Sequence, residues 1–166
     1  MEETKDLVTL EDIKRLVNAF YEKVRRDELL APIFNERIQD QWPQHLEKMY
    51  AFWQTVLLDE RTYLGSPFLP HTGLPVNHSH FQRWMELFIQ TADTLFQGEK
   101  AYEAKWRAGK MAELFESKIE YYKKTTFQKP TLNDHEIKII FESNQCFQEF
   151  LLLGSSIVMS DSNRSK

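Results

Sequence analysis

The sequence predicts an all-α domain, and three observations lead to this fold class. Apolar residues recur every three or four positions in four segments, which is the spacing of a helix that buries one face. No segment alternates apolar and polar residues for long enough to require a strand. The helix-breaking residues gather in one place, since two of the five glycines and three of the six prolines stand between Gly65 and Pro75.

The first expected helix begins at Thr9, because Asp12 stands three residues later, as in a capping box. Its apolar face consists of residues at helical spacing: Ile13, Leu16, Val17, Phe20, Tyr21 and Val24. The charged run at 25–28 ends this helix. Residues 29–34 are apolar, and we expect a short link there.

Three further helices are expected along the chain. The second helix spans residues 42–57 and has Pro43 near its start, where the missing N–H does no harm. Residues 60–80 lack helical spacing, and their large side chains favour a packed loop: Tyr63, Phe68, Leu69 and Leu74. Helical spacing returns at 81–95 and again at 102–119.

The sequence divides into a helical domain at residues 1–124 and a C-terminal extension at residues 125–166. Residues 125–133 are polar and contain a proline, which is typical of a linker. An amphipathic helix is expected at 134–153, and the Ser-rich residues after it are expected to be disordered. The apolar face of that helix supports one alternative function, a helical interaction module without a cofactor.

Charge and motifs exclude several classes of function. The formal net charge of -4 lacks the positive footprint that nucleic-acid binding needs. No run approaches the roughly 18 apolar residues of a membrane span, and the single cysteine, Cys146, fits a cytoplasmic protein. The sequence contains no phosphate loop and none of the motifs GxGxxG, CxxC, HExxH and GxSxG. Hydrolase and kinase functions therefore receive no support.

Histidines and aromatic rings remain as candidates for chemistry. His45 shares a helical face with apolar neighbours, His71 stands in the expected loop, and Tyr21 lies on the apolar face of the first helix. His78 and His80 are a weak zinc signal, because no third ligand is spaced to match. Twelve Phe, six Tyr and four Trp indicate either a bulky core or a pocket for a large flat ligand. This combination suits haem, whose iron needs one strong axial donor, commonly an imidazole, and apolar cover.

Six segments, taken in order, resemble the group III truncated haemoglobins. They are 20–25 (FYEKVR), 31–35 (APIFN), 42–45 (WPQH), 52–53 (FW), 63–75 and 81–88 (FQRWMELF). The chain also has no Gly-Gly pair, as expected for this group. The resemblance covers residues 9–124 and implies a truncated globin, a two-over-two helical sandwich that holds one b-type haem.

The resemblance also implies roles for individual residues. His71 is the proximal ligand of the iron, and Tyr21 and Trp84 are distal hydrogen-bond donors to bound O₂. His45 matches a distal histidine that gates ligand entry. The side chains that pack on the porphyrin or form the pocket wall are apolar: Phe34, Met49, Phe52 and Phe81. Two polar side chains are assigned to the haem propionates: Tyr63 and Arg83.

The implied function is binding of O₂, and of CO, NO or peroxide, with slow release. Two donors contribute about 1.5–3 kcal/mol each, which slows O₂ release by roughly 10²–10⁴-fold. Slow release argues against bulk transport. It favours NO dioxygenation or peroxidase-like turnover with a separate reductase, or moderation of O₂ supply to a respiratory oxidase. We expect a monomer that acts in the cytoplasm.

Overall fold

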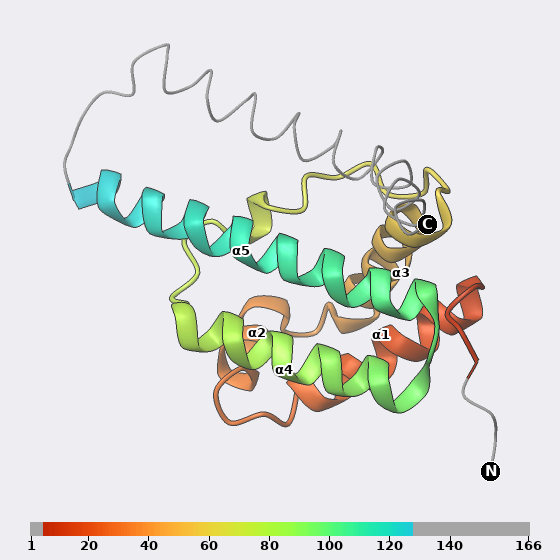
Figure 1. The fold of residues 1–166 in the computed structure, drawn as a ribbon. Helices are drawn as coiled ribbons and strands as arrows, with labels where there is room; N and C mark the ends of the chain where they lie inside the picture. Colours follow the sequence, from red (N-terminus) through yellow and green to blue (C-terminus); the bar gives the residue numbers. More distant parts are fainter. Residues whose placement is uncertain (1–4, 128–166) are drawn as a thin grey trace, which may run out of the picture. The chain divides into compact units, whose positions relative to one another are not determined.

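The computed structural model describes residues 5–127, and all regular structure within them is helical (Figure 1). The helices are α1 (Leu10–Val24), α2 (Ala31–Ile38), α3 (Trp42–Leu58), the 3-10 turn η1 (Leu69–His71), α4 (His78–Leu95) and α5 (Glu99–Phe127). Within this range no helix is both long enough and apolar enough to cross a bilayer. The expected helix at 134–153 and the expected tail lie outside the described residues.

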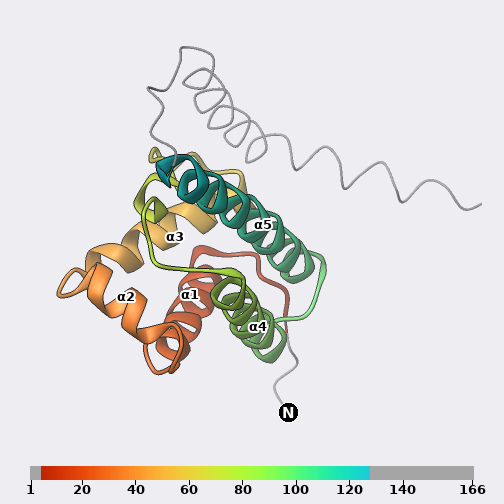
Figure 2. The same cartoon turned by 90° about the vertical axis from the view of Figure 1, so that its left-hand side faces the viewer.

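The four long helices form two pairs. α1 packs on α3 and on α4, and α4 packs in turn on α5. α1 with α3 forms one pair and α4 with α5 the other, and Figure 2 shows α1 beside α4, where the two pairs meet. This arrangement confirms the all-α, two-over-two fold class that the sequence predicts. Its core is almost entirely apolar and draws on all four helices: Leu16, Phe20, Val56, Leu57, Phe88, Ala104 and Ala108.

The expected capping box at the start of α1 is confirmed. The Thr9 Oγ1 atom accepts a hydrogen bond from the Asp12 N–H at 3.2 Å, and the Asp12 carboxylate accepts one from the Thr9 N–H at 3.0 Å. Asp12 is buried, and its charge is met by the Lys5 ammonium at 2.7 Å. These bonds satisfy backbone donors of the first turn and fix the direction in which α1 leaves the N-terminal segment.

Residues 31–38 form a helix, so the expectation of a mere link at residues 29–34 is wrong. The Asp27 carboxylate accepts hydrogen bonds from the Leu29 and Leu30 N–H groups at 3.1 and 3.0 Å, just before the helix begins. Pro32 then stands in the first turn, where its fixed φ favours a helix. The helix has only eight residues, and Ile38 is its one buried residue, which is why hydrophobic spacing alone did not reveal it.

The segment between α3 and α4 is packed, though not at every apolar residue that the sequence pointed to. Thr55 Oγ1 accepts hydrogen bonds from the Thr62 and Tyr63 N–H groups at 3.1 and 3.0 Å, which ties the segment to α3. Phe68 is 4% exposed, but Leu69 is 63% exposed. Successive residues of a 3-10 turn point in different directions, so the turn that brings His71 inward leaves Leu69 outside.

The N-terminal segment is tied to the start of α5 through Asp6, and this contact requires a glycine. The Asp6 carboxylate accepts hydrogen bonds from the Lys100 and Ala101 N–H groups at 3.0 and 2.9 Å. Gly98 has a φ of 147°, and a Cβ on it would overlap the Asp6 carboxyl group. Both features disfavour any other residue at this position.

We therefore expect Gly98→Ala to lower the free energy of unfolding by about 2 kcal/mol or more. Gly109→Ala is the matched control, because Gly109 lies inside α5 and its added Cβ would meet only Met85 Cε at 3.8 Å. That substitution should raise the free energy of unfolding by about 0.5–1 kcal/mol through better helix propensity. Urea titrations of both variants measure the difference, and equal effects would contradict the role given to Gly98.

Candidate functional site: an aromatic cavity

A cavity of about 230 Å³ lies among the five helices and the segment before α4. It brings together nine of the ten residues that the sequence analysis proposed: Tyr21, Phe34, His45, Met49, Phe52, Tyr63, His71, Phe81 and Trp84. Most other lining residues are apolar and come from every wall: Leu30, Ile33, Trp53, Leu74, Val76, Met111, Ala112 and Phe115. A site of this composition suits a flat, largely apolar ligand with few polar contacts.

One ring nitrogen of His71 is hydrogen-bonded to the backbone, and the other is free. His71 Nδ1 lies 2.8 Å from the Pro67 carbonyl oxygen, which only accepts, so Nδ1 carries the proton. Burial lowers the pKa of His71, and the charge of Arg37 acts in the same direction, although backbone hydrogen bonds oppose the shift. The Phe115 ring, 4.8 Å away, packs against the imidazole. The result is a neutral, oriented imidazole with an Nε2 lone pair for a metal.

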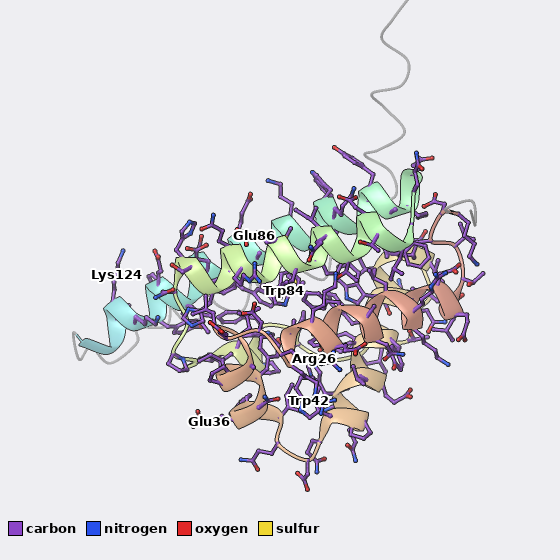
Figure 3. All side chains as sticks on the ribbon, turned by 90° about the horizontal axis from the view of Figure 1, so that it is seen from below. Arg26, Glu36, Trp42, Trp84, Glu86 and Lys124 are labelled. Carbon is purple, nitrogen blue, oxygen red and sulfur yellow. The ribbon has the colours of Figure 1, made fainter. Side chains whose placement is uncertain are left out.

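Tyr21 and Trp84 supply two hydrogen-bond donors that other described residues do not use. Neither the Tyr21 hydroxyl nor the Trp84 indole N–H forms a hydrogen bond within residues 5–127. Burial raises the pKa of Tyr21, so the hydroxyl keeps its proton. Phe20 packs edge-on against both rings, at 5.0 Å from Tyr21 and 5.2 Å from Trp84. Figure 3 shows Trp84 between α4 and α1.

His45 contributes a buried nitrogen without a partner. The Nε2 atom is completely buried, and no described residue forms a hydrogen bond with it. Burial lowers the pKa of His45 to about 4, with charge on His71 and Lys48 as smaller causes. The ring is therefore neutral at pH 7 and lies edge-on to Tyr21, at a centroid distance of 5.0 Å. An unpaired polar atom in a buried wall is costly unless a ligand or water meets it.

The low pKa of His45 predicts that acid destabilises the haem-free protein. The unfolded chain takes up a proton near pH 6.5, whereas the folded chain does so only near pH 4, so stability falls as pH decreases through this window. We expect a loss of about 2 kcal/mol between pH 7 and pH 5 from this residue. Urea titrations at several pH values should show a shallower pH slope for His45→Leu than for the wild type. An unchanged slope in His45→Leu would contradict the buried neutral state.

Arg83 is the one proposed site residue that the structure does not bring to the cavity wall. Its guanidinium lies 2.7 Å from Asp27 and 3.1 Å from Glu86, and these hydrogen bonds raise the pKa of Arg83. The ion pair with Asp27 joins the α1–α2 turn to α4. Arg83 is therefore occupied, whereas the exposed Lys48 of α3 does line the cavity.

Sequence reasoning missed Lys48 and Phe115 as site residues. Lys48 stands three positions after His45, and that spacing on α3 was the available signal for a cation beside the cavity. Phe115 was recognised only as part of an apolar helical face. Nothing in the sequence shows that this face meets the His71 ring, because Phe115 and His71 lie on different elements, α5 and η1, that are separated by the whole of α4.

The two histidines of the weak zinc signal, His78 and His80, have different partners, although His80 also lines the cavity. His78 Nδ1 lies 2.9 Å from a Glu116 carboxylate oxygen, which connects α4 with α5. His80 Nδ1 lies 2.9 Å from Asn77 Oδ1 and belongs to the cap of α4. No group of three or more His, Cys, Asp or Glu side chains stands ready for a metal anywhere in residues 5–127. A metal held by one protein nitrogen is the kind that His71 fits.

Comparisons with known proteins agree with this geometry. A family model described as bacterial-like globin matches residues 6–118. A group 3 truncated haemoglobin of Campylobacter jejuni is 33% identical over 121 residues, covering 70% of this chain and 95% of that protein. The crystal structure of a group III truncated haemoglobin from Campylobacter jejuni is also similar, with a TM-score of 0.66 and 32% identity. That match covers 70% of this chain and 95% of the other.

Proposed function

Because the chain belongs to the bacterial-like globins as a group III truncated haemoglobin, we propose that it binds O₂ and other diatomic ligands at a b-type haem held by His71. One observation carries the proposal. A neutral imidazole with a free Nε2 and three polar groups without partners, on Tyr21, His45 and Trp84, line one cavity whose other walls are mostly apolar. Haem, when bound, supplies an iron with one position open to a gas molecule.

Different residues of the chain have different roles in binding the haem and its ligand. His71 offers its Nε2 lone pair, and the Pro67 carbonyl keeps the ring in that tautomer. The hydroxyl of Tyr21 and the indole N–H of Trp84 donate hydrogen bonds toward the ligand. Lys48, which lines the cavity, would attract the propionates of a bound haem with its ammonium group, in the role that the sequence analysis gave to Arg83. The remaining apolar wall excludes water.

We further propose that the protein holds its ligand for reaction rather than for bulk transport. Two donors in a dry pocket slow the release of O₂ by roughly 10²–10⁴-fold. A ligand that leaves slowly is available to NO or to an electron, whereas a transport protein must release it. We propose that a separate reductase restores the reduced protein after each turnover, and that the chain acts as a cytoplasmic monomer.

An absorption spectrum of the haem-reconstituted protein tests the proposed function. The oxidised protein should show a strong Soret band that shifts when dithionite reduces it and shifts again when CO is added. The His78→Asn variant, whose exposed ring pairs with Glu116, is the matched control and should give the same spectra. A protein that shows only aromatic absorbance after reconstitution would overturn the proposal. If O₂ release is slow but the protein turns over neither NO nor peroxide, the result would favour a role in moderating the O₂ supply to a respiratory oxidase.

A further inference from the structure

Trp42 contacts Tyr21 and His45, two polar residues of the cavity wall, but does not line the cavity itself. Its ring lies 5.7 Å from the His45 ring at an interplanar angle of 85°, and 6.0 Å from the Tyr21 ring at 65°. Trp42 is 7% exposed although it is the first residue of α3, and it is absent from the cavity wall. The indole therefore fills the space behind the two distal residues.

Arg25 also contacts this tryptophan. The guanidinium carbon lies 4.7 Å from the centre of the Trp42 ring, within the range of a cation–π contact. Arg25 is the C-terminal capping residue of α1, one turn after Tyr21. Within residues 5–127 it forms no ion pair, whereas its neighbour Arg26 pairs with Glu22 at 2.9 Å. Figure 3 shows Trp42 near the end of α1 that carries Arg26.

Packing alone holds the His45 ring in place. No described residue forms a hydrogen bond with this ring, and its Nε2 is buried without a partner. The Tyr21 ring contacts it edge-on at 5.0 Å, and Trp42 contacts it from α3. Removing the larger of these neighbouring rings leaves space into which the His45 ring can turn, which gives it a second orientation.

We propose that Trp42, clamped by Arg25, is a positioning residue that fixes the His45 ring and so sets how fast diatomic ligands enter the cavity. The inference rests on the proposed function and on the gating role that the resemblance to truncated haemoglobins implies for His45. With the indole in place, the ring keeps one orientation and the open state is rare. Without it, the ring swings into the vacated space and the path opens.

The kinetics of CO binding test this inference in the haem-loaded protein. If the open state is about 10% populated or less, Trp42→Phe raises the CO association rate about tenfold or more. Arg25→Gln should raise the CO association rate about 2–5-fold, which corresponds to the free energy of one exposed cation–π contact. The rate of Arg25→Lys should stay close to that of the wild type, because lysine keeps the cation. Arg26→Gln is the matched control, because it removes the neighbouring cation without touching Trp42, and its rate should not change.

A double-mutant cycle separates positioning from general destabilisation. In a His45→Leu background, Trp42→Phe and Arg25→Gln should have no further effect on CO association, because the ring that they position is gone. Acceleration that persists in that background, or an unchanged rate in Trp42→Phe and Arg25→Gln, would overturn the inference. If the wild type binds CO normally but the cycle shows no coupling, this inference is refuted and the proposed function is not.

A second readout needs no haem. The nuclear magnetic resonance signals of the His45 ring in the haem-free protein should show one orientation in the wild type and in Arg26→Gln. In Trp42→Phe they should broaden or split as the ring exchanges between two orientations. Identical signals in wild type and Trp42→Phe would contradict the positioning role. A wild type that fails to bind haem refutes the proposed function, and this measurement still decides whether Trp42 holds His45.

Discussion

His71→Ala should lose stable haem binding, with an affinity loss greater than the about 10–100-fold that follows mutation of an outer partner of a metal ligand. The reason is that His71 alone, among the histidines that line the cavity, has its Nδ1 bonded to a backbone carbonyl and its Nε2 free. His45 remains in the wall, but it belongs to the distal group with Tyr21. Haem titration followed by the Soret band measures the loss.

His71→Gly provides the sharper form of this experiment. The substitution leaves a space that free imidazole can enter, so added imidazole should restore the haem spectrum of this variant. His78→Asn is the matched control, since His78 is exposed and pairs with Glu116, and it should bind haem as the wild type does. Normal haem binding by His71→Ala would contradict the assignment of the proximal ligand.

The second large effect is expected on O₂ release. Tyr21→Phe and Trp84→Phe should each speed O₂ dissociation by roughly 10–100-fold, because each removes one donor worth about 1.5–3 kcal/mol. The double variant should approach the product of the two effects if the donors act independently. Stopped-flow mixing of the O₂ complex with excess CO measures these rates.

Tyr50→Phe is the control for the loss of a tyrosine hydroxyl. Tyr50 lies on α3 and donates its hydrogen bond to Asn18 at 2.5 Å, and it does not line the cavity. Its O₂ dissociation rate should match that of the wild type. An unchanged rate in Tyr21→Phe would show that Trp84 or a water molecule stabilises the ligand instead.

Much of the fold follows from the sequence because hydrophobic spacing dominates in long helices. The apolar face of α1 and the capping pair Thr9 and Asp12 are local features, and both are as the sequence predicts. α2 was missed because its start depends on the Asp27 side chain rather than on periodic apolar residues. The burial of Phe68 and the exposure of Leu69 likewise depend on the η1 turn, which is not a local property of composition.

The site was predictable in its residue types but not in its contacts. The sequence indicates which side chains gather, and nine of the ten line one cavity. It does not indicate that Asp27, which precedes Arg83 by 56 positions, forms an ion pair with it. The clamp of Arg25 on Trp42 is equally non-local, because it joins the end of one helix to the start of another. Such pairings arise from the packing of helices, and hydrophobic spacing does not specify partners.

The central claim is that the His71 nitrogen holds the haem, and resonance Raman spectroscopy with isotope-labelled histidine tests it most directly. The reduced wild-type protein should show an iron–histidine stretching band that shifts when the protein histidines carry heavy nitrogen. In His71→Gly rescued with unlabelled imidazole, the band should be present and should not shift with labelling of the protein. A band that still shifts in the rescued variant would mean that another histidine, such as His45 or His80, holds the haem, and would contradict the account.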